Sequence, residues 1–419
     1  MPAQAMRIQK VTSPGGIEAW LVESHEVPLI AMQFGFAGGS LQDPDGRDGL
    51  ANFVSGILDE GAGDLDAIAF HERMQELAVR MSFDAGRDVF SGSLQTLTEN
   101  SAEGFELLRM ALTEARFDED AIARIRTQIV AGLKIEETDP DRVAGREWYK
   151  LAFGEHPYSR PPQGDIGTVQ AITAVDLKDY ARRVFARDSL KVAVVGDIDA
   201  KRLASVLDQV FGSLPAKGDL RPVDEAKPPM GPIRKVVEMD VPQSVARFGH
   251  LGLKRSDKDF VAASVLNYIV GGGGFSSRLM EEVREKRGLA YSVYSYLSPY
   301  RHAALYLGGV ATENKSIGQS LEVIQNVLRD LATNGPSQQE LDAAKSYMTG
   351  SFPLRFDTSG KIASQLLWIQ IENLGIDYID KRNSLVEAVT LEDIKRVAKR
   401  LIHADGLIVI VVGKPAGTL

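Results

Sequence analysis

An internal repeat is the feature of this sequence that most restricts the folds open to it. Residues Thr173–Lys178 begin a helical pattern that leads to an apolar strand, and that strand ends at Gly196. The same pattern begins again at Thr390–Lys395, and its strand ends at Gly413. The two threonines and the two glycines are each 217 residues apart (390 − 173 and 413 − 196). Self-similarity at a fixed offset indicates that one structural plan is used twice.

A second pair of matching segments supports the duplication. Thr98-Glu99-Asn100 returns as Thr312-Glu313-Asn314, and each copy lies between a strand-like stretch and an amphipathic helical pattern. Between the two halves lies a proline-rich segment, 214–234, which should be extended because proline fixes φ and lacks an amide proton. We therefore expect a first domain over 1–213, a linker over 214–234 and a second domain over 235–419.

Each half mixes strand and helix patterns. Apolar patterning predicts that 17–22 and 30–36 form a hairpin pair opening the first half, and that 236–239 and 246–253 do the same in the second. Helical periodicity follows in the first half at 50–58, 67–77, 101–115 and 119–137. Strands joined by short turns and followed by helices predict an α+β fold. We expect two tandem homologous domains, each a mostly antiparallel sheet with helices packed on it, facing each other across a clam-like cleft.

Composition excludes several kinds of site. The chain has no cysteine, so disulfides, thiolate nucleophiles and cysteine-ligated metals are excluded. The net charge is −9 and there is no cluster of Lys and Arg, so nucleic acid is not an expected partner. No apolar run approaches the length of a membrane span. Four of the six histidines lack a partner at i+4, so they predict no metal pair on a helix: His71, His250, His302 and His403.

The N-terminus gives one indication of compartment. Ala3-Gln4-Ala5 has the A-x-A form that ends a cleaved signal peptide, although no apolar h-region precedes it. A chance alanine-rich terminus explains these residues equally well. The sequence therefore weakly favours a periplasmic location over a cytoplasmic one.

One helical segment carries a specific resemblance. Gly49–Gly61 reads GLANFVSGILDEG, which is similar to the segment G-L-A-H-F-L-E-H-M-L-x-x-G of the insulinase and mitochondrial processing peptidase family. In that family an H-x-x-E-H helix supplies two zinc ligands and the general base, because residues i and i+4 share a helix face. Here Asn52 stands at the first histidine position, Ser55 at the glutamate position and Gly56 at the second histidine position.

The resemblance also locates the family's third zinc ligand, a glutamate in a later helix. The matching positions here are Ala131 and Gly132, and neither carries a donor atom on its side chain. Glu136 and Glu137 lie about one turn further on, but carboxylates without histidines make a poor zinc site. The resemblance therefore implies that this chain binds no metal and lacks the general base.

A second segment keeps the family pattern. Gly271, Gly272, Gly273 and Gly274 precede the sequence FSSRLMEEVREKRGLAYSV. This closely resembles the family's second-domain signature, in which a glycine loop and a short helix lead to R-x-K-x-G-L-A-Y and a strand. The resemblance carries the family's R-x(6)-Y pair onto Arg284 and Tyr291. In the family this pair holds the substrate carbonyl and stabilises the oxyanion.

The chemistry of this pair is physically sound. A fixed cation and a phenolic donor aimed at developing negative charge contribute several kcal/mol in a dry site. Taken singly, Arg284 would be interpreted as a solvated charge and Tyr291 as a packing residue, and the long match favours the functional interpretation. The glycine run, 271–274, is interpreted either as a substrate contact or as a flexible hinge.

Together, the lost and the retained motifs predict one half of a peptidase. In several two-subunit members of the family, one subunit carries H-x-x-E-H and the other carries the R-x(6)-Y pair. The resemblance implies that this chain is the second kind, inactive alone and paired with a homologous H-x-x-E-H subunit to hydrolyse extended peptides. Zinc is then expected on the partner. The alternative is a non-catalytic homologue, either an assembly scaffold like the core subunits of a respiratory complex or a homodimeric peptide-binding chamber. A scaffold gives no reason to retain the R-x(6)-Y pair.

Overall fold

The chain divides into two compact units. The computed structural model describes residues 6–229 and 231–416, so Ala3-Gln4-Ala5 lies outside the described residues and the compartment stays a prediction. Unit 1 comprises Met1–Lys134, Pro161–Pro222 and Leu354–Tyr378, and unit 2 comprises Ile135–Arg160, Val223–Pro353 and Ile379–Leu419. Each unit therefore includes residues from both sides of the proline-rich segment 214–234. The predicted domains, 1–213 and 235–419, are each continuous in sequence.

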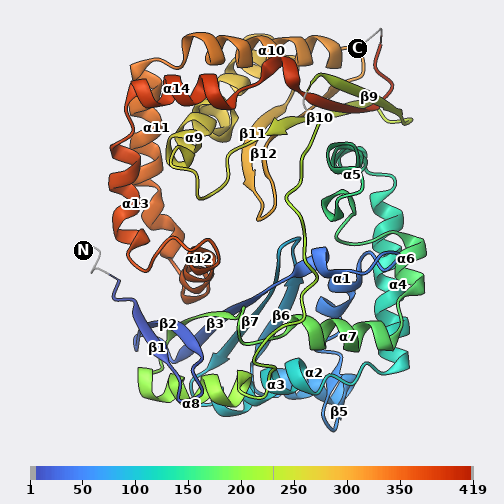
Figure 1. Cartoon of the computed structure of the whole chain (residues 1–419), viewed down its shortest axis with the longest axis vertical. Helices are drawn as coiled ribbons and strands as arrows, with labels where there is room; N and C mark the ends of the chain where they lie inside the picture. The colour runs from blue at the N-terminus through green and yellow to red at the C-terminus, as the bar shows by residue number, and fades with distance from the viewer. Residues whose placement is uncertain (1–5, 230, 417–419) are drawn as a thin grey trace. The chain divides into compact units, whose positions relative to one another are not determined.

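Unit 1 is built on a six-stranded sheet (Figure 1). Its strands are β1 (Gln9–Thr12), β2 (Glu18–Glu23), β3 (Leu29–Ala37), β6 (Arg80–Ala85), β7 (Val89–Leu97) and β8 (Lys191–Gly196). They lie in the order β1-β2-β8-β3-β7-β6. The pair β2–β8 is parallel, and all other neighbouring pairs in this sheet are antiparallel. A separate two-stranded ribbon joins β4 (Gly61–Ala62) to β5 (Leu65–Asp66).

Unit 2 repeats this topology with five strands. They are β9 (Ile233–Glu238), β10 (Gln243–Leu251), β11 (Ser292–Pro299), β12 (Ala304–Glu313) and β13 (Ile408–Gly413). The order β9-β13-β10-β12-β11 matches β2-β8-β3-β7-β6 strand for strand, and the one parallel pair, β9–β13, falls at the equivalent place. The α+β class and the mostly antiparallel sheets are confirmed.

The predicted opening hairpins are wrong. Strand β8 lies between β2 and β3, and β13 lies between β9 and β10. Both inserted strands are apolar and buried along nearly their whole length, so they occupy the interior of a sheet covered on both faces. The N-terminal hairpin that does form joins β1 to β2, with Gln9 opposite Leu21.

Helices cover one face of the unit 1 sheet. The helices of this unit, with α4 crossing its boundary, are α1 (Leu50–Ser55), α2 (Ala67–Glu76), α3 (Ser101–Thr113), α4 (Glu119–Glu136), α6 (Ile166–Ala171), α7 (Ala174–Val184), α8 (Ala200–Phe211) and α12 (Ser359–Ile371). On β3, Phe34 points toward this helical layer, and its ring centroid lies 5.5 Å from that of Phe211 on α8. Thr173 caps α7 with a capping box, in which the threonine oxygen accepts from the amide of Asp176.

The helices of unit 2 are α5 (Pro140–Phe153), α9 (Phe260–Asn267), α10 (Ile317–Asn334), α11 (Gln338–Gly350), α13 (Tyr378–Glu387) and α14 (Leu391–Leu401). Thr390 caps α14 as Thr173 caps α7, which is the structural basis of the sequence repeat. No helix within 6–229 and 231–416 has both the length and the apolar character that crossing a membrane requires.

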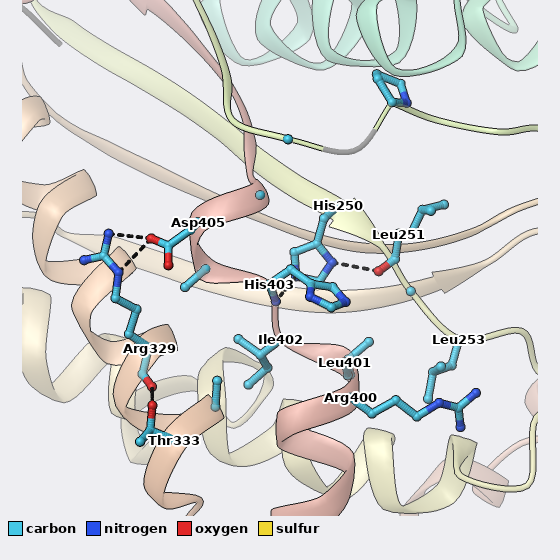
Figure 2. A pocket seen from close by; sticks show the side chains of 16 residues that line it. His250, Leu251, Leu253, Arg329, Thr333, Arg400, Leu401, Ile402, His403 and Asp405 are labelled. Atoms are coloured by element: carbon cyan, nitrogen blue, oxygen red, sulfur yellow. Dashed lines mark hydrogen bonds and ion pairs between the residues drawn. The ribbon is translucent and has the colours of Figure 1, made fainter.

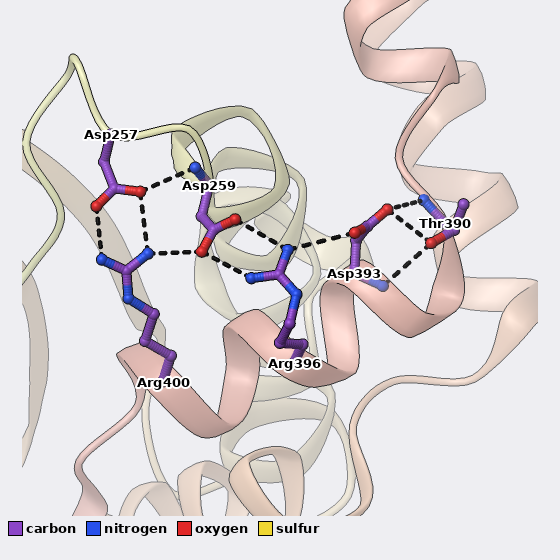
Figure 3. Close-up of polar contacts among 6 residues, drawn as sticks. All are labelled: Asp257, Asp259, Thr390, Asp393, Arg396 and Arg400. Carbon is purple, nitrogen blue, oxygen red and sulfur yellow. Dashed lines mark hydrogen bonds and ion pairs between the residues drawn. The ribbon is translucent and has the colours of Figure 1, made fainter.

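An ion-pair network fastens α14 to the start of α9 (Figure 3). The carboxylate of Asp259 accepts hydrogen bonds from Arg396, at 2.7 and 2.9 Å, and from Arg400, at 2.5 Å. Arg400 also donates to Asp257 at 2.6 Å. The hydrogen bonds from Arg396, aided by those from Arg400, lower the pKa of Asp259 to about 2 against the opposing effect of burial. The carboxylate therefore stays ionised at any physiological pH.

The second face of the unit 1 sheet is covered by α12, a helix from the C-terminal half of the sequence. It packs on β3 and β8 (Figure 1). Gly35 of β3 faces this helix, because a Cβ there would be in van der Waals contact with Cδ1 of Ile371, at 3.5 Å. Gln370 Nε2 donates to the carbonyl of Val192 at 2.9 Å. Phe34 and Gly35 are adjacent, so these two helical layers lie on opposite faces of the sheet.

In unit 2, too, one sheet face is covered by a helix from the other half of the sequence. Helix α5, from the N-terminal half of the sequence, packs on β10 and β13. Gly249 is its counterpart of Gly35, because a Cβ there would lie 3.0 Å from the indole of Trp148. Trp148 is 1% exposed, and its Nε1 donates to the carbonyl of Ile408 at 3.0 Å. Each half of the sequence thus supplies a helix to the other unit.

Candidate functional site

The residues at the family's zinc positions lie on two helices of unit 1. Asn52 and Ser55 are on α1, and Gly56 directly follows it, with its amide donating to the carbonyl of Asn52 at 3.2 Å. The hydroxyl of Ser55 donates to the same carbonyl at 2.8 Å, so it is held by the helix backbone. Gly132 lies on α4, where an added Cβ would meet no described heavy atom within 4 Å. A Cβ at Gly56 would lie 3.6 Å from Ile125, so α1 and α4 adjoin there.

This set of residues does not fit a zinc ion. A catalytic zinc needs three protein ligands from histidine, cysteine or carboxylate side chains, and these positions offer an amide, a hydroxyl and two glycines. Among the described residues there is no group of three or more His, Cys, Asp or Glu that could hold a metal. Glu60, five residues beyond the end of α1, has a side chain that is 13% exposed and forms an ion pair with Arg124 of α4. This pair links α4 to the segment that follows α1.

The glycine run, 271–274, lies in unit 2 between α9 and a short π-helix, η5 (Met280–Glu285). A Cβ at Gly271 would come within 2.5 Å of the backbone nitrogen of Ser295, so this glycine allows close approach to β11. Gly274 has φ of +57°, a conformation that favours glycine. The backbone structure therefore explains why glycine stands at these two positions. A substrate contact by the glycine run 271–274 stays a prediction.

Arg278 anchors the segment that follows the glycines. Its guanidinium donates to both carboxylate oxygens of Glu340, at 2.5 and 2.8 Å, and to Asp330 at 2.8 Å. Burial opposes ionisation of Glu340, but the bonds from Arg278 and Ser337 lower its pKa to about 2. The start of η5 is therefore fixed to α10 and α11.

The structure brings Arg284 and Tyr291 together and adds a third residue. Arg284 lies on η5, and Tyr291 directly precedes β11. The guanidinium carbon of Arg284 lies 4.8 Å from the ring centroid of Tyr291 and 4.6 Å from that of Phe275. The sequence prediction did not include Phe275. Its position directly after the glycine run was the available signal.

This aromatic–arginine cluster, defined as Phe275, Arg284 and Tyr291, is open to solvent. The rings of Phe275 and Tyr291 are 69% and 80% exposed. Among the described residues Arg284 meets one carboxylate, that of Glu285, at 3.4 Å from Nε. Neighbouring charges are paired more tightly: Glu282 accepts from Lys286 and Arg287, each at 2.6 Å. Arg284 is therefore the most weakly paired cation of this segment.

A separate cavity of about 740 Å³ opens in unit 2 at the ends of α10 and α14 (Figure 2). Its histidines come from distant parts of the sequence: His250 Nε2 accepts from the amide of His403 at 3.2 Å, and His250 Nδ1 donates to Leu251 O at 2.7 Å. Burial lowers the pKa of His250 to about 4, so it is neutral at pH 7. A search for histidines four residues apart on a helix could not reveal this contact, because His250 and His403 are 153 residues apart in the sequence.

The charged residues that line this cavity are already paired. Arg329 bonds Asp405 at 2.6 and 2.8 Å, and Arg400 bonds Asp257 and Asp259. His250 uses both ring nitrogens, as described above. The cavity therefore presents no activated acid–base pair for hydrolysis, and the aromatic–arginine cluster is the stronger candidate site.

The chain is similar to known proteins in both sequence and structure. Residues 171–348 match the family model described as the peptidase M16 inactive domain. The chain is 29% identical to the non-peptidase homolog YmxG of Helicobacter pylori, over 80% of this chain and 78% of that one. It is 24% identical to the uncharacterized zinc protease YmxG of Bacillus subtilis, over 98% and 99% of the two chains. The crystal structure of a peptidase M16 inactive domain from Pseudomonas fluorescens superposes with a TM-score of 0.92 and 28% identity, covering 99% of each chain.

Proposed function

We propose that this chain, which resembles the peptidase M16 inactive domain over residues 171–348, is the metal-free subunit of a two-subunit zinc peptidase. One observation carries the proposal. The zinc positions Asn52, Ser55 and Gly56 hold no zinc-binding side chain, whereas Arg284 and Tyr291 are present and in contact, and Tyr291 is exposed. A chain that served only as a scaffold would have no reason to keep a weakly paired arginine beside two exposed rings.

In the proposed complex the substrate is an extended peptide. The partner subunit's zinc and glutamate would supply the activated water that attacks the peptide carbonyl. Arg284 would donate a hydrogen bond to the carbonyl oxygen. The phenolic hydroxyl of Tyr291 would donate a second hydrogen bond as negative charge develops on that oxygen. The Tyr291 hydroxyl suits this role because it has no hydrogen-bond partner among the described residues, and the residue as a whole is 80% exposed. The name of the Helicobacter pylori relative, a non-peptidase homolog, supports a chain that is inactive alone.

The proposal is tested by reconstitution. The isolated chain should bind no stoichiometric zinc and should not cleave a quenched-fluorescence peptide library. When it is mixed with an H-x-x-E-H homologue from the same organism, a 1:1 complex with peptidase activity should form. Arg284→Ala should lower kcat by about 10²- to 10³-fold, as removal of an oxyanion donor does, and Tyr291→Phe should lower kcat without weakening assembly.

Arg287→Ala is the matched control, because Arg287 lies three residues away and is paired with Glu282. It should leave kcat within about twofold. Zinc-dependent cleavage by the isolated chain would refute the division of labour. Peptides eluting from a purified homodimer, with no activity in any mixture, would instead establish the peptide-binding alternative.

A further inference from the structure

We propose that Phe275 is the residue that positions Arg284 for substrate, a role that the family pattern does not assign. The inference rests on the proposed function of Arg284. It is carried by geometry: the Arg284 guanidinium carbon lies 4.6 Å from the Phe275 ring centroid, slightly closer than the 4.8 Å to Tyr291. Two rings therefore hold one guanidinium.

The backbone around Phe275 is built to aim its ring. Gly274, with φ of +57°, turns the chain directly before it. The hydroxyls of Ser276 and Ser277 then donate back to the carbonyls of Gly273 and Gly274, at 3.0 and 2.7 Å. These two bonds close a tight turn in which Phe275 is the central residue. The ring is thus held by a fixed turn, although it is 69% exposed.

The contact decides what the guanidinium can bind. The guanidinium carbon lies over both rings, and the N–H groups at the guanidinium edge can donate in its plane to a carbonyl or carboxylate oxygen. Without Phe275, Arg284 would be free to tighten its ion pair with Glu285, whose carboxylate lies 3.4 Å from Nε, into a direct hydrogen bond. An arginine engaged by Glu285 would be misplaced for a substrate carbonyl. Phe275 therefore keeps Arg284 available as well as oriented.

The kinetic test uses the complex with the zinc-bearing homologue. Phe275→Leu should lower kcat roughly ten- to hundredfold with little change in KM, because misplacement of a catalytic group costs that much. Phe275→Tyr keeps a ring and should restore kcat to within about threefold of wild type. In an Arg284→Ala background, Phe275→Leu should have no further effect. Tyr347→Leu, which removes another exposed ring in unit 2, is the control for general surface changes.

A second measurement separates this inference from the proposed function. In the full chain alone, the Arg284 Nε–H proton should show a ring-current shift in NMR spectra, assigned with Arg284→Lys, and Phe275→Leu should abolish most of it. An unshifted proton, or one unaffected by Phe275→Leu, would overturn the inference even if the complex were active. Full activity of Phe275→Leu would overturn it too. A ring-current shift lost in Phe275→Leu, combined with inactive wild-type mixtures, would uphold the positioning by Phe275 and refute the peptidase role.

Discussion

Lowering the pH should destabilise unit 2 through a single buried histidine. His250 lies within the core, 6% exposed, stacked on Tyr306 with ring centroids 5.1 Å apart. Burial lowers its pKa from 6.5 to about 4, with a smaller contribution in the same direction from His403. As the pH falls, the unfolded chain therefore takes up a proton on this residue before the folded chain does. Stability is complete above about pH 6.5 and is lost as the pH falls toward 4.

The size of the effect follows from the two pKa values. Each pKa unit corresponds to about 1.4 kcal/mol, so protonation of His250 costs unit 2 about 3 kcal/mol in total. About 2 kcal/mol of this is already lost at pH 5. His25 acts in the opposite sense, because its hydrogen bond to Asp197 raises its pKa and favours the folded state as the pH falls. The contribution of His250 must therefore be isolated by substitution.

The assay is urea unfolding between pH 5 and 7.5, with Trp148 as the reporter of unit 2. The chain has three tryptophans, so Trp20→Phe with Trp368→Phe leaves Trp148 alone. His250→Gln keeps a donor and an acceptor but cannot titrate. The stability difference between wild type and His250→Gln should shrink by about 2 kcal/mol from pH 7.5 to pH 5.

His403→Gln is the matched control, because His403 contacts His250 but is exposed. It should leave most of the pH dependence in place. If wild type and His250→Gln differ by the same free energy at every pH, the buried histidine does not carry the effect and the reasoning fails.

Two further predictions concern packing. Trp148→Phe should lower the free energy of unfolding by about 1–3 kcal/mol, because it leaves a buried carbonyl of β13 without its hydrogen-bond donor. Trp368→Phe, at a 40% exposed position, should change that free energy by less than about 0.5 kcal/mol. Equal effects of the two substitutions in thermal unfolding would contradict this prediction. Gly271→Ala should displace β11 at Ser295 and raise hydrogen exchange there, because its Cβ would lie 2.5 Å from that amide nitrogen. Gly274→Ala has no described atom within 4 Å of the new Cβ, so it should cost about 1–2 kcal/mol through its φ alone, with β11 exchange unchanged.

Local patterns predicted the elements of the fold well. Periodicity placed a helix at 119–137, and the structure has α4 at Glu119–Glu136. The repeated Thr-x-x-Asp segments predicted helix starts, and both are capping boxes. These features are fixed by residues within one or two turns of each other, which a single sequence displays directly.

Long-range pairing was not predictable in the same way. An apolar strand such as β8 shows that it is buried, but its composition does not say which strands flank it, so the hairpins were wrong. In the candidate site, the contact of Phe275 with Arg284 crosses a turn that belongs to no regular periodicity. A sequence motif identified Arg284 and Tyr291, but only the structure shows that Phe275 contacts Arg284.

The helix that each half supplies to the other unit governs when the protein can finish folding. The sheet of unit 1 has all its strands by Gly196, yet the helix that covers its second face ends at Ile371. During synthesis roughly 175 residues separate the two, which at ordinary rates is on the order of ten to thirty seconds. Through that interval the second face of the sheet is without its helix. A nascent chain of this kind would depend on early protection of that face, and neither half expressed alone should give a stable domain.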